Sequence, residues 1–191
     1  MAKRGYTMIG IETSKEMLAV ARQKPFSDQI QWIHGDAQKL EGLQADLVLM
    51  TSHVAQFLLE EKSWQSMLTA AHKAIKPGGH IMFDSKNPLA KPWERWTRKM
   101  SRKTNTPYGE IEMWYNLLEI KKNRAIHEIH YLFTQSGEEL LSINELIYRT
   151  KEELTKSLEE AGFVIEHTFG DWDSSPANAE SPEFIFVAVH E

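Results

Sequence analysis

The first half of the chain alternates short apolar runs with segments of helical periodicity. Apolar runs at residues 6–11, 30–34, 47–50 and 80–84 predict four short strands. The apolar spacing over 15–24 and 63–75 predicts helices between them, with Ser14 as an N-cap and Pro25 as a stop. Met17, Leu18 and Ala21 should form the inner face of the first helix. Such alternation predicts a parallel sheet with right-handed crossovers, and the run LVLM predicts a central strand covered on both faces.

The pattern changes after Pro88. Residues 111–120, 125–133 and 140–148 predict three antiparallel strands separated by turn-forming KKNR and QSGEE. A helix over 151–161, a strand at 163–169, a polar loop and a last strand at 183–189 follow. We therefore predict an α/β fold: a Rossmann-like, doubly wound, mostly parallel sheet with an antiparallel three-stranded insertion and a C-terminal antiparallel hairpin.

Composition narrows the functional classes. The chain has 191 residues and is 41% apolar, which suits one domain. Its 22 basic and 27 acidic residues give a net charge of −5, so its overall field attracts neither nucleic acid nor an anionic membrane. Cysteine is absent, which excludes disulfides and thiolate chemistry. With no signal-like or bilayer-spanning apolar run, we expect a soluble cytoplasmic protein.

Polar residues follow directly on the predicted strands, where open parallel sheets bind ligands. Glu12 can accept hydrogen bonds from both hydroxyls of a ribose, although it can also simply favour the start of the next helix. Asp36 can accept from the exocyclic amine of adenine, although a Gly-Asp pair more often closes an Asx-turn. The group Thr51-Ser52-His53 and Asp84 complete this row of strand ends.

The ordered set of motifs resembles the class I S-adenosylmethionine-dependent methyltransferases, particularly small bacterial members. The segments GIETSKEML, HGDAQKL, ADLVLMTSHVAQFL and KPGGHIMFD carry the resemblance in order, and FDSKNP, WERW, AGF and GDWD extend it over the whole chain. The resemblance implies S-adenosylmethionine as cofactor. It implies Glu12 and Thr13 on the ribose side, Asp36 and Ala37 on the adenine side, and Thr51 at the end of a central strand.

One departure from the family concerns the start of the fold. The family places a first strand and a Gly-x-Gly loop ahead of this region, and MAKRGY resembles only the end of the helix that follows them. That loop allows the backbone to approach the methionine moiety of the cofactor. We therefore expect the first strand to be missing, Met1 to be an internal or misassigned start of a longer protein, and this chain to bind the cofactor weakly.

The expected organisation is a single domain over 1–191, with a cofactor-binding half at 1–87, an acceptor-side insertion at 88–150 and a C-terminal helix with two strands at 151–191. Transfer from a sulfonium is an in-line displacement, in which a general base is optional. His53 is the candidate base; it can equally cap the following helix or pack on the cofactor.

Three residues are candidates for contacting the acceptor. Trp93 and Trp96 are large rigid surfaces suited to a lid, and Asp173 lies in the GDWD loop; most tryptophans are core residues, however. The expected partner is a small-molecule acceptor, with no membrane, and a homodimer is compatible with the sequence. We assign no metal, because His127 and His130 stand three residues apart in a strand and should face opposite sides.

Other functions stay open. Segment 91–103 has six basic residues and two tryptophans, a pattern typical of RNA binding and hence of an RNA-modifying methyltransferase, although a solvated helix explains it better on an acidic chain. A truncated, non-catalytic domain with weak cofactor binding is the third possibility. A dinucleotide-binding protein fits less well, since it leaves Asp36 and the Lys-Pro-Gly-Gly turn unexplained.

Overall fold

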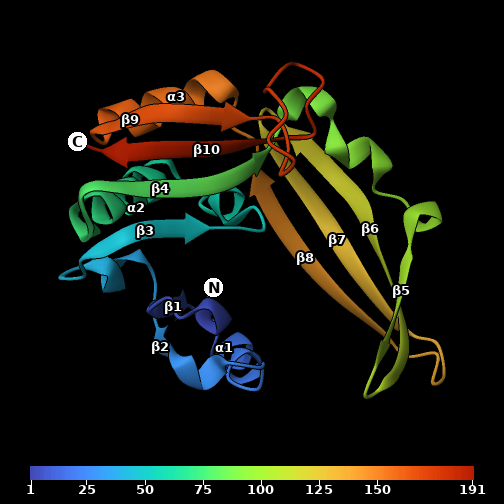
Figure 1. Ribbon diagram of the computed structural model, residues 1–191. Coiled ribbons are helices and arrows are strands. Elements are labelled where there is room, and N and C mark those ends of the chain that lie inside the picture. The colour runs from blue at the N-terminus through green and yellow to red at the C-terminus, as the bar shows by residue number, and fades with distance from the viewer.

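The computed structural model describes all 191 residues, and its strands form three sheets (Figure 1). The first is a parallel pair, β1 (Met8–Glu12) and β2 (Ile30–His34). The second has the order β3 (Ala45–Met50), β4 (Ile75–Lys86), β10 (Glu183–His190) and β9 (Phe163–Phe169). The third is an antiparallel sheet of β5 (Arg102–Thr106), β6 (Gly109–Lys121), β7 (Arg124–Phe133) and β8 (Glu139–Ile147).

Three α-helices join these strands: α1 (Lys15–Ala21), α2 (Glu61–Ala74) and α3 (Lys151–Glu160). The α/β fold, the antiparallel insertion and the C-terminal hairpin are confirmed. The second sheet is mixed, because β3 runs parallel to β4 whereas β10 runs antiparallel to both of its neighbours. None of the helices is long and apolar enough to cross a membrane.

Three predicted details differ from the structure. The insertion has four strands rather than three, because residues 102–106, which begin at the end of the basic segment 91–103, pair with β6 as an extra edge strand. Segment 91–103 favoured a solvated helix, but residues 88–100 form three short 3-10 turns, two of which begin with Pro88 and Pro92. β4 begins at Ile75, directly after α2, so the Lys-Pro-Gly-Gly turn belongs to an irregular first part of the strand.

The prediction that the third strand is central is also wrong. β3 hydrogen-bonds only to β4 and forms the edge of its sheet. Its residues alternate: Met50 joins the core, whereas Leu47 and Leu49 remain 39% and 42% exposed. Successive side chains of a strand point to opposite faces of the sheet, so an apolar strand is fully buried only when both faces are covered. Only the face of β3 that carries Met50 is covered.

Helix α1 begins as the sequence predicts but covers less surface. The hydroxyl of Ser14 accepts a hydrogen bond from the Met17 backbone N–H at 3.1 Å, which caps the helix. Leu18 is buried, whereas Met17 points outward and is 57% exposed. The helix has only seven residues, so its inner face consists of little more than Leu18.

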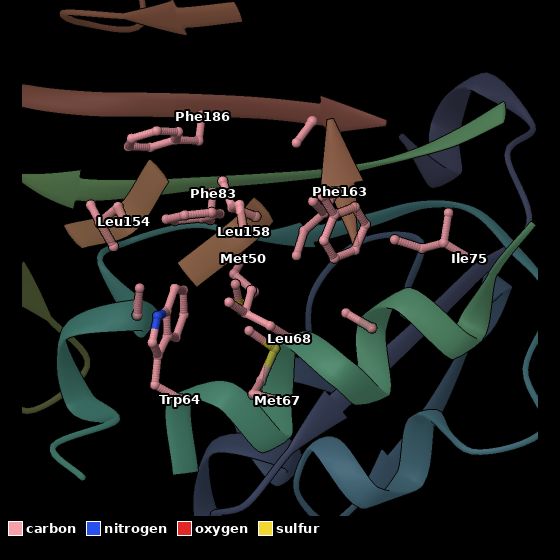
Figure 2. Close-up of a cluster of buried hydrophobic side chains, with 14 of the residues drawn as sticks. Met50, Trp64, Met67, Leu68, Ile75, Phe83, Leu154, Leu158, Phe163 and Phe186 are labelled. Carbon is pink, nitrogen blue, oxygen red and sulfur yellow. The ribbon is translucent and has the colours of Figure 1, made fainter. Parts of the chain in front are cut away.

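The main core lies between α2, α3 and the β3–β4–β10–β9 sheet (Figure 2). Trp64 of α2 meets the edge of the Phe83 ring at a centroid distance of 5.4 Å, and Phe83 stacks on Phe186 at 5.3 Å. Leu154 and Leu158 of α3 close the cluster, and all five side chains are essentially inaccessible. This core fixes β4 and β10 against each other.

The antiparallel sheet extends away from this body (Figure 1) and carries a second, smaller cluster. Ala125, Leu146 and Tyr148 are buried there, with Trp93 and Trp96 packed against them. The insertion is thereby fixed at its base, while Leu140, Leu141 and Ile143 of the edge strand β8 are more than half exposed.

Replacing Phe83 with alanine should strongly destabilise the protein. The substitution leaves a cavity between Trp64 and Phe186, and such changes cost about 3–5 kcal/mol. Urea unfolding followed by circular dichroism measures the loss, and Phe83→Leu serves as a milder variant if Phe83→Ala does not fold. The control Leu141→Ala removes an exposed side chain and should cost less than about 0.5 kcal/mol. Equal urea midpoints for the core and surface variants would contradict this account of the core.

Stability should fall as the pH drops from 7.5 to 5. Burial lowers the pKa of His72 and of His127 below the ordinary value of about 6.5, and the neighbouring His190 lowers that of His72 further. The unfolded chain therefore binds more protons in this range, so stability present above pH 6.5 is lost as the pH falls from 6.5 towards the lowered pKa values of the two folded rings. Urea midpoints across this range measure the loss. His127→Phe, which keeps the ring beside Trp96, should flatten the pH dependence; an unchanged slope would argue against this cause.

Candidate functional site

Three polar side chains from distant parts of the chain meet at one end of the mixed sheet, where the parallel strands β3 and β4 finish. His53 follows the carboxyl end of β3, and Asp84 lies near the carboxyl end of the neighbouring parallel strand β4. Glu183 is the first residue of β10, and the antiparallel register pairs it with Lys86 of β4. Because β10 is antiparallel to β4, its amino end lies at the same end of the sheet as the carboxyl ends of β3 and β4.

His53 links the two acids: its ring hydrogen-bonds to Glu183 and lies close to Asp84. His53 Nε2 lies 2.6 Å from Glu183 Oε2 and 3.5 Å from Asp84 Oδ2. The backbone N–H of His53 also donates to Asp84 Oδ1 at 2.9 Å, so the buried aspartate holds both the main chain and the ring of the histidine. The side chain of His53 remains 25% exposed, which leaves the imidazole accessible from solvent.

The backbone around His53 has an unusual conformation. Ser52 and His53 have φ values of 62° each, in the left-handed region that residues with a side chain adopt infrequently. The buried Arg149 fixes the turn that follows, because its guanidinium donates to the carbonyl oxygens of Ala55 at 3.2 Å and Leu58 at 2.8 Å. A conformation of this kind persists only where the surrounding structure holds it, and Asp84 and Arg149 supply that support.

The cluster carries excess negative charge. No lysine or arginine nitrogen lies within 4.0 Å of the carboxylate of Asp84 or of Glu183, and His53 is the single basic partner of both. Asp84 is 2% exposed and Glu183 is half-buried, so water screens these charges incompletely. The ligating atoms of the three side chains lie within 4.8 Å of one another.

The structure brings Glu12 and Asp36 to the same end of one sheet. β1 and β2 are parallel, Glu12 pairs with His34, and the carbonyl oxygen of Glu12 accepts from Gly35 N–H at 3.0 Å. The carboxylate of Glu12 accepts from Ser14 N–H at 2.8 Å, and that of Asp36 accepts from Gln38 N–H at 2.9 Å. Both acids therefore also have the local turn-forming contacts that the alternative interpretations describe.

The other residues predicted to bind the cofactor lie close to these strand ends. Thr13 is exposed, and its carbonyl oxygen lies 2.9 Å from His34 Nε2, which ties the two loops together. Ala37 begins a 3-10 turn and packs against the main core. Thr51 is exposed directly after β3, two residues before His53.

The structure does not gather the three predicted acceptor residues into one group. Trp93 meets Tyr148 edge-on at 4.8 Å, and Trp96 contacts Tyr115 and His127 at 5.8 and 4.5 Å, so both tryptophans pack the base of the insertion. Asp173 lies in an exposed turn, where hydrogen bonds from Ser175 lower the pKa of its carboxyl.

The two histidines of β7 face opposite sides of their sheet, as the spacing predicts. His127 stacks near Trp96, whereas His130 stacks on Trp114 at 4.6 Å. They do not form a pair of metal ligands with each other.

Two residues of the site were missed from the sequence. Glu183 could have been noticed as an acid directly before the apolar run FIFVAV, but only the antiparallel register shows that it faces Asp84 and His53. Arg149 lies between a strand and a helix, where a basic residue is unremarkable by pattern alone. A buried arginine needs partners, and the carbonyl groups it binds come from a segment more than ninety positions earlier.

Comparisons with known proteins show which proteins the chain resembles. Residues 1–79 match the family model described as a methyltransferase domain. The chain is 24% identical over 194 aligned positions to YqeM of Bacillus subtilis strain 168, a candidate methyltransferase, with 98% of this chain and 77% of that protein covered.

Solved structures share the fold. An S-adenosylmethionine-dependent methyltransferase from Clostridium acetobutylicum is 14% identical with a TM-score of 0.80, covering 96% of this chain and 75% of its own. The sugar N-methyltransferase KedS8 from a Streptoalloteichus species is 18% identical with a TM-score of 0.69, covering 96% and 70%. The match over residues 1–79 and the similarity to the curated relative both point to a methyltransferase domain, and the chain shares the fold of S-adenosylmethionine-dependent methyltransferases.

Proposed function

We propose that this chain transfers the methyl group of S-adenosylmethionine to a small-molecule acceptor at the carboxyl ends of its strands. The observation that carries the proposal is the placement of Glu12 and Asp36 on adjacent parallel strands at one end, where nucleotides bind in open α/β sheets. The resemblance to enzymes of this class over nearly the whole chain supports it.

The adenosine half of the cofactor would lie against β1 and β2. The carboxylate of Glu12 would accept hydrogen bonds from the ribose hydroxyls, with Thr13 beside it, and Asp36 and Ala37 would contact the adenine ring. Thr51 would border the cofactor at the end of β3. The bound cofactor supplies an electrophilic methyl group on a sulfonium, while the protein binds and orients both reactants.

We further propose that the methionine half of the cofactor needs a glycine-rich loop. The 191 residues contain no Gly-x-Gly sequence, whereas β1 and β3 each have one edge with no hydrogen-bonded strand. A strand placed between those edges could satisfy their backbone groups and carry such a loop. Binding by this chain would then depend mainly on the adenosine contacts and would be weak.

His53 would act as the general base. Its Nε2 lies 2.6 Å from Glu183 Oε2, and its Nδ1 makes no hydrogen bond within the protein, so one ring nitrogen can carry the ring proton while the other receives a proton from the acceptor. The acceptor would approach across the insertion, with Trp93, Trp96 and Asp173 proposed to border it. This assignment gives residues 1–87 to cofactor binding, residues 88–150 to the acceptor side, and residues 151–191 to the C-terminal helix and last two strands.

The basic segment does not favour RNA as the acceptor. Lys103 pairs with Glu110 at 2.9 Å, and the guanidinium carbon of Arg98 lies 4.4 Å from the centre of the Trp114 ring. These two cations are engaged by the insertion itself, which supports a small-molecule acceptor over the RNA alternative.

Replacing Glu12 with alanine should weaken binding of the cofactor product S-adenosylhomocysteine. Hydrogen bonds to a charged group contribute about 1.5–3 kcal/mol each, so the dissociation constant should rise at least about tenfold. The melting temperature at millimolar ligand measures this, since a ligand that binds the folded state raises it. Glu41→Ala removes the same charge from an exposed position and should match the original chain. If the original chain shows no ligand-induced shift, cofactor binding by this chain is disproved.

Replacing His53 with glutamine should lower kcat by about 10²–10⁴-fold, the usual contribution of a general base. The measurement is S-adenosylhomocysteine release with an acceptor that the original chain methylates, together with the pH profile of kcat. His80→Gln, which alters an exposed histidine on the same sheet, is the control. Full turnover by His53→Gln would rule out this role.

A further inference from the structure

The charge around His53 points to the chemical class of the acceptor. We propose that Asp84 and Glu183 bind the acceptor as an ammonium ion, which makes the chain an N-methyltransferase of small-molecule amines. This inference rests on the proposed function and adds the substrate class to it.

The first argument is charge. Asp84 and Glu183 contribute two negative charges, and a single imidazole can offset at most one of them. No lysine or arginine forms an ion pair with either acid, so the cluster remains negative in every protonation state of His53 in which both acids are ionised. A partly buried excess charge is costly, and a cationic ligand removes that cost.

The second argument is hydrogen bonding. Both carboxylates only accept hydrogen bonds when ionised, and an ammonium group offers three donors. Glu183 Oε1 accepts no hydrogen bond within the protein, and Asp84 Oδ2 meets only the imidazole, at 3.5 Å. The His53 side chain is 25% exposed and that of Glu183 is 14% exposed, so a ligand can reach Glu183 from solvent, whereas the side chain of Asp84 is 3% exposed.

The third argument is proton balance. An ammonium ion must lose a proton before its nitrogen can attack. Both carboxylates lie on the Nε2 side of His53, so Nε2 can accept this proton when the neutral ring carries its own proton on Nδ1, and Nε2–H then donates to Glu183. The nitrogen lone pair then forms the N–CH₃ bond, and the C–S bond breaks with its electron pair remaining on sulfur. The products are a methylated ammonium ion and a neutral thioether, and the proton on His53 passes to solvent.

Two other ligands fit less well. An acceptor that presents a carboxylate or a phosphate would face two like charges. A divalent metal would need its ligands spread around it: two atoms each about 2.0–2.1 Å from a tetrahedral ion lie about 3.3 Å apart. His53 Nε2 and Glu183 Oε2 are separated by 2.6 Å, a direct hydrogen-bond distance.

The fold contains a matched control. His80 Nε2 lies 2.8 Å from Glu166 Oε2, but this pair is exposed and has no second carboxylate beside it. It reproduces the histidine–glutamate contact of the site without the excess buried charge. Glu166→Gln therefore makes the same chemical change as Glu183→Gln at a position outside the site.

The test uses the full chain labelled with ¹⁵N, with NMR detection of the His53 ring nitrogens. We expect methylammonium chloride to shift these resonances saturably, at millimolar concentration and constant ionic strength. Methanol and tetramethylammonium, which lack the charge and the N–H donors respectively, should leave them unchanged. Glu183→Gln and Asp84→Asn should weaken methylammonium binding at least about tenfold, a loss comparable to one charged hydrogen bond, while Glu166→Gln should not.

Several results would overturn the inference. These are the absence of a saturable methylammonium shift, an equal response to tetramethylammonium, and Mn²⁺ binding at micromolar concentration that methylammonium does not displace. Methylation of an acceptor at oxygen would overturn it as well. If the buried Asp84→Asn variant does not fold, Glu183→Gln alone decides, with its folding checked by the backbone spectrum.

The two proposals fail separately. A chain whose melting temperature responds to S-adenosylhomocysteine but whose His53 ignores methylammonium retains the proposed methyl transfer and loses the amine assignment. A chain that binds methylammonium without responding to S-adenosylhomocysteine contradicts the cofactor proposal instead.

Discussion

The antiparallel pairing of β10 with β4 is the constraint on which the rest of the structure depends. It places Phe186 opposite Phe83, so that the two rings stack in the core beside Trp64. The same register places Glu183 opposite Lys86, the last residue of β4. Successive residues of a strand point to opposite faces, so a shift of one residue would turn Phe186 out of the core. The packing of the core therefore also fixes the position of Glu183.

The candidate site depends on this register because its parts are far apart in the chain. His53 and Glu183 are 130 positions apart and meet through a single side-chain contact. The turn that carries His53 is fixed from two sides: Asp84 binds its backbone N–H, and Arg149 binds the carbonyl groups that follow. Burial lowers the pKa of Arg149, while its contact with Glu61 opposes that effect. The buried guanidinium thus links the start of α3 to the loop after β3.

Local pattern predicts those parts of this fold that local interactions determine. The cap at Ser14, the helix that begins at Lys151 and three of the four strands of the insertion follow from residue type and periodicity. The edge position of β3 could not be predicted in this way, because the run LVLM describes an apolar strand and not its neighbours. Glu183 was missed for the same reason: its role depends on a register between strands a hundred residues apart.

The same distinction between local and long-range information applies to the predicted site residues. Glu12 and Asp36 could be related from sequence, since two consecutive parallel strands bring their carboxyl ends together. The tryptophans could not be assigned, because aromatic residues suit both a lid and a packed core. The contacts of Trp96 with Tyr115 and His127 show that it packs the base of the insertion.

The electrostatics of the reaction explain why two carboxylates beside His53 suit nitrogen better than oxygen. When a neutral amine attacks a sulfonium, positive charge leaves the sulfur and develops on the nitrogen. Fixed negative charges near that nitrogen interact more strongly with the transition state than with the neutral amine, which is the condition for catalysis. A hydroxyl acceptor activated by proton loss would instead carry negative charge on its oxygen, and Asp84 and Glu183 would raise the energy of that state. The same pair of carboxylates therefore attracts an ammonium ion and favours its methylation once it has lost a proton.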